Sequence, residues 1–307
     1  MTKYIVKRLL LLVPVVIGIT LFIYVIMSLA PGNPAMLILG QDATAEEIAA
    51  KEAELGLNDP IIVRYIHYMA GVLQGDFGVS WYNNYNVMDE FLSRIPNTLI
   101  LGILSNAFVI LFGIPLGVIA AVKQNSFIDY FSLVIAMLLS SMPAFWFGLM
   151  AQVLFCLTLG WLPATGAETM KHFLLPALTL GCASFAGQVR LTRTSILEVN
   201  KLDYVRTARA KGCSEGRVIV KHVLRNALLP VVTTIGSHIA TIVGGAIVTE
   251  SVFAIPGVAS LMINAVKLRD VPVVMGIIVI ISVFVGVVNL LVDLTYAMID
   301  PRVKLNG

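Results

Sequence analysis

The sequence has little charge. Only 13% of its 307 residues are Asp, Glu, Lys or Arg, whereas 58% are hydrophobic, and the mean hydropathy is +0.90. Soluble domains carry about 25% charged residues. The shortage of charge therefore excludes an ordinary soluble domain, and we expect an all-α polytopic membrane protein.

Cysteine and histidine are also scarce. The three cysteines, Cys156, Cys182 and Cys213, form no CxxC pair, which argues against a disulfide framework and against a zinc site. The four histidines have no ligand-like spacing. We therefore expect no metal site in this chain.

Catalytic motifs are absent as well. The sequence contains no HExxH, no GxSxG, no GxxxxGK[ST] phosphate loop and no pair of aspartates in adjacent spans, so we assign no catalytic residue. Without a phosphate loop the chain is not itself an ATPase. Its basic stretch lacks interleaved aromatic residues, which gives no support to a nucleic-acid partner.

Long apolar stretches dominate what remains. Six are long enough to span a bilayer: Leu9–Leu29, Thr98–Val122, Tyr130–Leu159, Phe173–Leu197, Ala227–Thr249 and Val273–Ile299. Pro143 interrupts the third, and Pro176 with Arg190 and Arg193 interrupts the fourth. The first is too long for a signal peptide, and we interpret it as an uncleaved span.

The distribution of basic residues predicts the orientation. With the N-terminus inside, the inner side receives 15 Lys and Arg residues and the outer side receives 6. This bias follows the positive-inside rule. We therefore expect a multi-pass membrane protein with both termini in the cytoplasm.

Three parts follow along the chain: an N-terminal tail and first span (1–30), an extracytoplasmic segment (31–97) and a core of five spans (98–307). In the segment, Thr44 is expected to cap a helix that ends at Gly56, and a second helix is expected after Pro60. Its aromatic residues, among them Trp81 and Tyr82, fit either a membrane-interface belt or a receptor-docking surface.

One polar stretch, at about 198–229, interrupts the core; we call it the coupling segment. Val205, Ala208 and Gly212 recur at i, i+3 and i+7, which predicts a small-residue helical face open to another protein. Gly212 ends that helix, and Ser214 is expected to cap a second one. The alternative is a basic loop that fixes topology or contacts anionic lipid.

The stretch YVRTARAKG resembles the coupling (EAA) loop of ABC importer permeases, in the branch for peptides, nickel and glutathione. Arg206 and Thr207 stand where the general pattern has an acidic residue and an alanine, and Gly212 matches its glycine. Further similarities follow in order along the chain: LAPGNPA, GDFGVS, RIPNTLILG, LPATG, LLPALTLG, ESVFAIPGVASLMINAVKLRDVPVV and DPR.

The resemblance implies a type I ABC importer permease fold of six transmembrane helices, with a small helical exterior segment between spans one and two. It implies the first permease of a heterodimer that imports di- and oligopeptides through the bacterial plasma (inner) membrane. The other partners would be two cytoplasmic ATP-binding subunits, which use ATP and Mg²⁺, and an extracytoplasmic substrate-binding protein; this chain would bind no cofactor. The residues implied to contact the ATPase are Tyr204, Val205, Arg206, Thr207, Ala208, Arg209, Ala210, Lys211 and Gly212.

Polar residues inside the spans are candidates for the translocation path, because exposing them to lipid is costly. They are Asn106, Gln152, Gln188, Ser237, His238, Thr241, Glu250, Asn289 and Asp293. The face that carries His238 and Thr241 is the preferred lining, and Glu250 is expected at the outer gate. For each residue the alternative is an interhelical hydrogen bond.

Other functions stay open at this point. The same architecture serves the import of a nickel chelate or of glutathione. A gradient-driven secondary transporter would need paired ionisable residues near the midplane, for which Asp293 is the sole candidate in the sequence.

Overall fold

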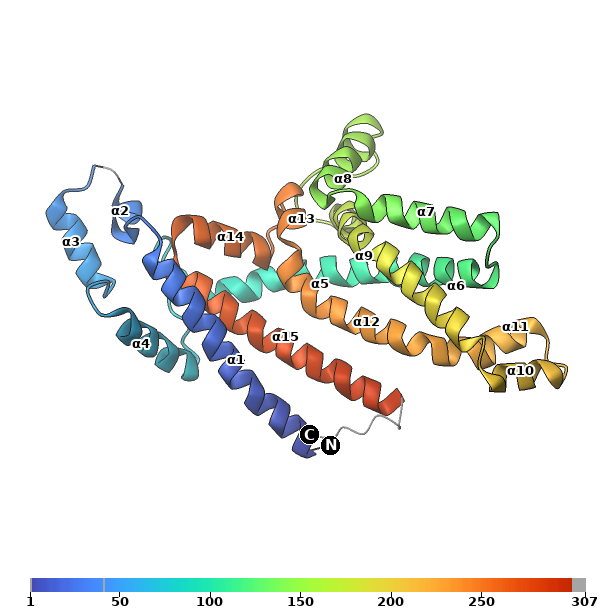
Figure 1. The fold of residues 1–307 in the computed structure, drawn as a ribbon. Helices are drawn as coiled ribbons and strands as arrows, with labels where there is room; N and C mark the ends of the chain where they lie inside the picture. The colour runs from blue at the N-terminus through green and yellow to red at the C-terminus, as the bar shows by residue number, and fades with distance from the viewer. Residues whose placement is uncertain (1, 41, 300–307) are drawn as a thin grey trace. The chain divides into compact units, whose positions relative to one another are not determined.

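The computed structural model describes the backbone of residues 2–40 and 42–299, and the side chains of residues 4–40, 42–238 and 246–294. Helices account for nearly all of these residues. Among the described residues, extended backbone pairs at one isolated antiparallel bridge, between Val79 and Asn86. Figure 1 colours these helices in chain order. The chain divides into two compact units. Among the described residues, those up to Asn97 and Pro256–Val287 form the first unit, and Thr98–Ile255 with residues 288–299 form the second.

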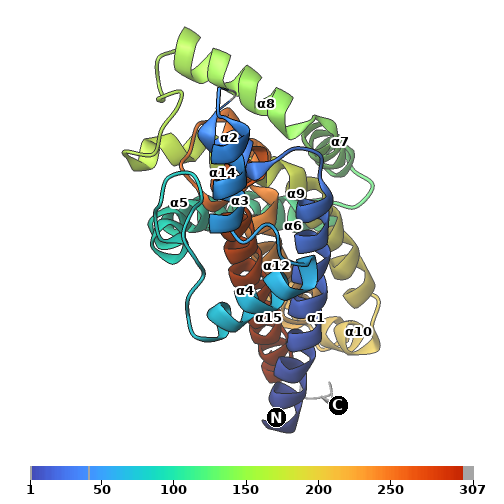
Figure 2. The same ribbon diagram turned by 90° about the vertical axis from the view of Figure 1, so that its left-hand side faces the viewer.

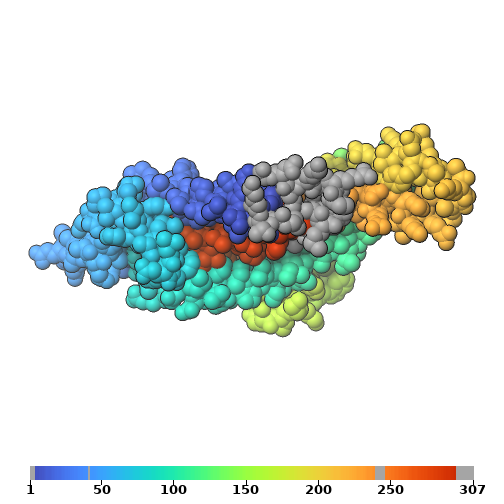
Figure 3. All heavy atoms as spheres, turned by 90° about the horizontal axis from the view of Figure 1, so that it is seen from below, coloured from blue at the N-terminus to red at the C-terminus, as the bar shows by residue number. Residues whose placement is uncertain are grey.

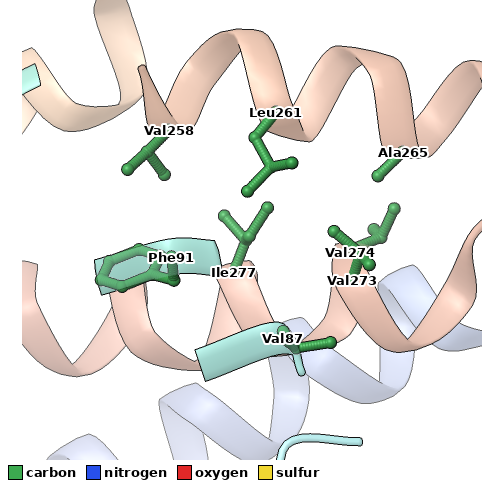
Figure 4. Close-up of a cluster of buried hydrophobic side chains, with 8 residues drawn as sticks. All are labelled: Val87, Phe91, Val258, Leu261, Ala265, Val273, Val274 and Ile277. Carbon is green, nitrogen blue, oxygen red and sulfur yellow. The ribbon is translucent and has the colours of Figure 1, made fainter. Parts of the chain in front are cut away.

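The first unit combines the N-terminal helices with two helices from late in the chain. It contains α1 (Thr2–Leu29), α2 (Pro34–Leu39), α3 (Ala45–Glu54), α4 (Ile61–Leu73), the start of α5 (Val87–Phe108), α14 (Val258–Leu268) and most of α15 (Val271–Ile299). Its main core lies between α14, α15 and α5. Val258, Leu261 and Ala265 recur at i, i+3 and i+7, so one face of α14 meets Ile277 of α15 and Phe91 of α5 (Figure 4).

The helices at Ala45–Glu54 and Ile61–Leu73 begin where the sequence predicts. The Thr44 side chain accepts a hydrogen bond from the Glu47 backbone N–H, and the Glu47 carboxylate accepts one from the Thr44 N–H, which starts α3 with a capping box. These bonds hold the pKa of the Glu47 carboxyl below its ordinary value. Gly56, at φ +65°, follows the end of α3, and α4 begins directly after Pro60. Both predicted helices are confirmed.

Two neighbouring residues tie the turn between α14 and α15 to the end of the first helix and to the loop at Ser80. The Arg269 guanidinium donates to the backbone carbonyls of Ala30 and Gly32. The buried Asp270 carboxylate accepts hydrogen bonds from the Ser80 hydroxyl and the Trp81 backbone N–H. Burial nevertheless raises the pKa of Asp270.

The second unit is built around one long helix. Its elements are the rest of α5, η1 (Val109–Gly113), α6 (Ile114–Val122), α7 (Phe127–Ser141), α8 (Ala144–Ala151), η2 (Gln152–Thr158), α9 (Met170–Val199), α10 (Asp203–Ala210), α11 (Glu215–Arg217), η3 (Val218–Val223), α12 (Leu224–Gly245), α13 (Ile247–Val252) and the end of α15. Helix α9 contacts α6, α7, α8 and α12. Gly117 of α6 permits close packing, because a Cβ there would lie 2.7 Å from the Val189 carbonyl oxygen of α9.

Six segments correspond to the predicted spans. Within the described residues, five helices are long and apolar enough to cross a membrane, and the pair formed by α7 and α8–η2 is a sixth when counted as one span. That pair is bent by 97°, as Figure 2 shows where α7 meets α8. The break falls at Met142 and Pro143, which confirms the predicted interruption of the third span.

The helices differ from the predicted apolar stretches in three places. The helix that contains the second stretch begins at Val87, before Thr98, because α5 starts among the polar residues that precede the apolar run. Pro176 does not interrupt α9; it sits in the second turn of a continuous 30-residue helix, where it removes one hydrogen bond. Helix α12 ends at Gly245, short of the predicted Thr249, and Glu250 lies on the separate helix α13.

Candidate functional site

The coupling segment folds as a compact helical group between α9 and α12. Its elements α10, α11 and η3 lie beyond the ends of these two long helices (Figure 1), and their yellow atoms project together in the space-filling view (Figure 3). Gly212 separates α10 from α11 with φ +78°, a left-handed conformation that favours glycine. The predicted helix, glycine and second helix are therefore present in that order.

The predicted open face of α10 is wrong. Val205 is 0% exposed and Ala208 is 7% exposed. They pack in a cluster with Ile196 of α9, Val218 and Val223 of η3, and Ala121 of α6. The small side chains of α10 allow it to pack closely against this chain's own helices. This packing removes the apolar face of α10 from water.

The surface that α10 leaves open is polar. Its exposed residues are Asp203, Tyr204, Arg206, Thr207 and Ala210, and they are followed by exposed Lys211 and Gly212. A Cβ added at Gly212 would meet no atom within 4 Å. Any partner of the coupling segment therefore meets this surface and not the Val205 and Ala208 face.

One arginine holds the coupling segment together. Arg209 donates from Nε to Glu215 Oε1 at 2.7 Å and from Nη2 to Asn200 Oδ1 at 2.7 Å. These contacts link α10 to α11 and to the end of α9. The hydrogen bond with Glu215 raises the pKa of Arg209, so its guanidinium stays charged.

A tyrosine makes the second link. The Tyr204 hydroxyl donates to the His222 carbonyl oxygen at 3.2 Å and accepts from Asn226 Nδ2 at 2.7 Å. This joins α10 to η3 and to the start of α12. The second helix is not the single α-helix expected from Ser214 onward. It is one short turn followed by a π-helix, and Val220 is 66% exposed.

The candidates for the translocation path do not form one cluster. Buried Glu250 accepts a hydrogen bond from Thr98 Oγ1 at 2.7 Å, and Gln152 Nε2 donates to the Ala164 carbonyl oxygen at 2.8 Å. Asn106 Nδ2 donates to the Gly102 carbonyl oxygen within α5. The contacts of Glu250 and Gln152 match the alternative in which polar groups fix helix packing, because they reach α5 and α13, whereas the Asn106 hydrogen bond stays within its own helix.

The face of α12 that is the preferred lining of the translocation path includes an exposed residue. Ser237 is exposed and donates to the Thr233 carbonyl oxygen of its own helix at 3.2 Å. His238 is half-buried, and the side chain of Thr241 lies outside the described residues. The role of this face in a path stays a prediction.

An ion pair within the second unit was missed from the sequence. Arg193 of α9 donates from Nε to Asp129 Oδ1 at 2.7 Å and from Nη2 to Oδ2 at 2.8 Å. The Asn125 backbone N–H donates to the same carboxylate. Asp129 follows the cap Ser126 in the first turn of α7; an acidic residue beside a span, with an arginine inside another span, was the available signal.

Comparisons with known proteins define the class. Residues 113–305 match the family of binding-protein-dependent transport system inner membrane components, and residues 1–102 match the N-terminal family of such membrane components. The chain belongs to this family of ABC importer permeases.

Individual relatives place it within the dipeptide and glutathione branch. The chain is 42% identical to the dipeptide transport system permease protein DppB of Alkalihalophilus pseudofirmus, over 99% of this chain and all of the relative. It is 42% identical to the glutathione transport system permease protein GsiC of Salmonella typhimurium, over 99% of both chains.

The fold agrees with this class. Two solved structures of the MetNI methionine ABC transporter in inward-facing conformations superpose with TM-scores of 0.57 and 0.58 at 16% identity. Each covers 69% of this chain and 97% of its own. The chain is therefore a multi-span permease subunit with the type I ABC importer fold.

Proposed function

We propose that this chain forms one half of the translocation pore of an ATP-driven importer of short peptides, and that a second, similar permease forms the other half. The relatives whose names specify dipeptide and glutathione transport support a peptide substrate. Di- and oligopeptides are the first candidate. Glutathione, itself a tripeptide, is the second. Membership of the ABC importer family replaces the gradient-driven alternative.

The coupling segment is the proposed contact with a cytoplasmic ATP-binding subunit. The observation that carries this proposal is its construction: Arg209 and Tyr204 tie a polar helix to the ends of two long apolar helices. A rigid link of this kind transmits the movement of a bound ATPase to the spans. ATP and Mg²⁺ would be bound by the two ATP-binding subunits and not by this chain.

The distribution of charge supports an orientation of the chain in the membrane, and this orientation decides on which side a substrate-binding protein would act. The excess of basic residues on one side, 15 against 6, supports cytoplasmic termini and a cytoplasmic coupling segment. Residues 31–97 then face the other side, where a substrate-binding protein would deliver the peptide. The exposed Ser237 and half-buried His238 remain the proposed lining of the path.

A bulky substitution on the exposed surface of α10 tests the coupling role. Ala210→Trp adds an aromatic ring where Ala210 is exposed, so the fold of this chain should be kept. We expect loss of ATP-dependent uptake of a labelled dipeptide and loss of co-purifying ATP-binding subunits. Ala49→Trp on exposed α3 is the matched control, and it should leave both unchanged. Full uptake by the Ala210→Trp variant would refute the coupling role.

Uptake competition tests the substrate separately. In wild-type vesicles supplied with the binding protein, we expect unlabelled dipeptides to compete with the labelled dipeptide. Stronger competition by glutathione than by the unlabelled dipeptides would favour the second candidate.

A further inference from the structure

We propose that the second unit carries a binding groove for one acyl chain of an anionic phospholipid, with Lys171 beside the lipid headgroup. The groove has a volume of about 500 Å³ and lies among α5, η1, η2, α9 and the turn at Trp161. Every lining residue is Leu, Ala, Phe or Trp. Its size falls in the range of roughly 300–1,000 Å³ that is usual for small-ligand sites.

The floor of the groove is fixed by aromatic packing. Phe108 stacks on Phe185 with ring centroids 5.4 Å apart and also contacts Phe112 at 5.3 Å. Phe108 lies against Gly181, where an added Cβ would come within 2.8 Å of its ring. The absence of a side chain at position 181 therefore leaves room for the ring, and the groove has a defined base.

One edge of the groove has the chemistry of a membrane interface. Trp161 lines the groove, is 65% exposed and contacts the Phe155 ring at 5.9 Å. Tryptophan is enriched at the level of lipid headgroups because its ring is apolar and its N–H is polar.

A positive charge lies on the face of α9 that lines the groove. Lys171 is exposed and precedes Leu174 and Leu178, two lining residues, by three and seven positions, so all three share one face of α9. The Glu168 carboxylate, three positions before Lys171, lies 2.7 Å from His172 Nε2, and the ion pairs found among the described side chains do not include Lys171. An ammonium thus stands one helical turn from an apolar lining.

The positive charge and the apolar lining together determine which kind of molecule fits the groove. An extended peptide would leave its backbone N–H and C=O groups without partners in a groove lined by carbon. A phospholipid matches both parts, because its acyl chain fills the apolar groove while its phosphate lies near Lys171. We therefore assign the groove to a lipid rather than to a protein segment.

Photo-crosslinking tests this assignment. The full chain, with the subunits that co-purify, is reconstituted with phosphatidylglycerol that carries a diazirine on one acyl chain, and in parallel with phosphatidylcholine that carries the same chain. Labelled peptides are mapped by mass spectrometry. We expect the peptide with Leu174 and Leu178 to favour phosphatidylglycerol about fivefold. The exposed Leu157, outside the groove, should show no preference.

Two variants separate the groove from general lipid contact. Lys171→Gln, a surface change, should abolish the preference for phosphatidylglycerol, and Ala107→Phe should reduce labelling by both lipids because it fills the groove. Equal labelling of the groove and of Leu157 by the two lipids would overturn the proposal. Crosslinks from the groove to another protein in place of lipid would overturn it as well.

Discussion

Asp129 and Arg193 form a bidentate ion pair in which the Asp129 side chain is 1% exposed and the Arg193 side chain 21% exposed. Removing one member of a buried pair leaves the other charge without compensation. Asp129→Asn should therefore lower the free energy of unfolding by about 3 kcal/mol, the low end of the usual range.

The midpoint of thermal unfolding of the detergent-solubilised chain measures this effect. Glu54→Gln is the matched control, because the Lys51–Glu54 pair lies at the surface with Glu54 64% exposed, and it should change the midpoint little. Equal midpoints for both variants would show that the Asp129–Arg193 pair contributes no more than a surface pair.

Gly212 and Gly216 lie four residues apart in the coupling segment but have different backbones. Gly212→Ala forces a Cβ into a left-handed conformation at φ +78° and should cost about 1–2 kcal/mol of local stability. Gly216→Ala is helical and meets no atom within 4 Å, so it should be neutral or slightly stabilising. Trypsin cleavage within 201–217 should be faster only in the Gly212→Ala variant. Similar cleavage rates would argue against the observed turn.

At the scale of elements, the attachment of α10 to the helices around it depends more on Arg209 than on Arg206. Arg209→Gln removes contacts to both Glu215 and Asn200. Arg206→Gln removes one exposed contact to Asp203 at 3.8 Å. Hydrogen exchange of the α10 amides should therefore rise in Arg209→Gln and stay unchanged in Arg206→Gln. A rise of the same size in both would mean that the segment is held by its apolar cluster alone.

The sequence predicted some elements well and others poorly for identifiable reasons. Local chemistry marked the capping box at Thr44, the bend at Pro143 and the turn at Gly212. The sequence did not reveal which side chains from distant parts of the chain pack against each other. The direction in which Val205 and Ala208 face depends on Ile196 and Val218, which fold back against them, and periodicity alone does not say what covers a face.

Helix α14 illustrates the same limit. The stretch Glu250–Val274 was recognised by resemblance, and its helical period was not assigned. Its apolar positions contact residues of α5 that lie far away in the sequence (Figure 4). Buried polar residues were likewise identified by type, yet the partners of Glu250 and Gln152 became known only from the fold.

For the whole molecule, the apolar spans indicated a multi-span membrane protein and the order of similarities indicated an ABC importer permease, and the family matches show both. The placement of residues 1–30, 31–97 and 98–307 relative to the membrane remains a prediction. The two compact units bring residues 256–287 together with the N-terminal part, which no linear division of the sequence indicates.

The central claim is that the coupling segment meets an ATP-binding subunit in the cytoplasm. The most direct measurement places a photo-crosslinking amino acid at position 210, in the intact membrane assembly, and compares it with the same group at position 49. We predict crosslinks from position 210 to an ATP-binding subunit and none from position 49. Crosslinks from position 210 to lipid alone, or to a protein on the outer side, would contradict the account.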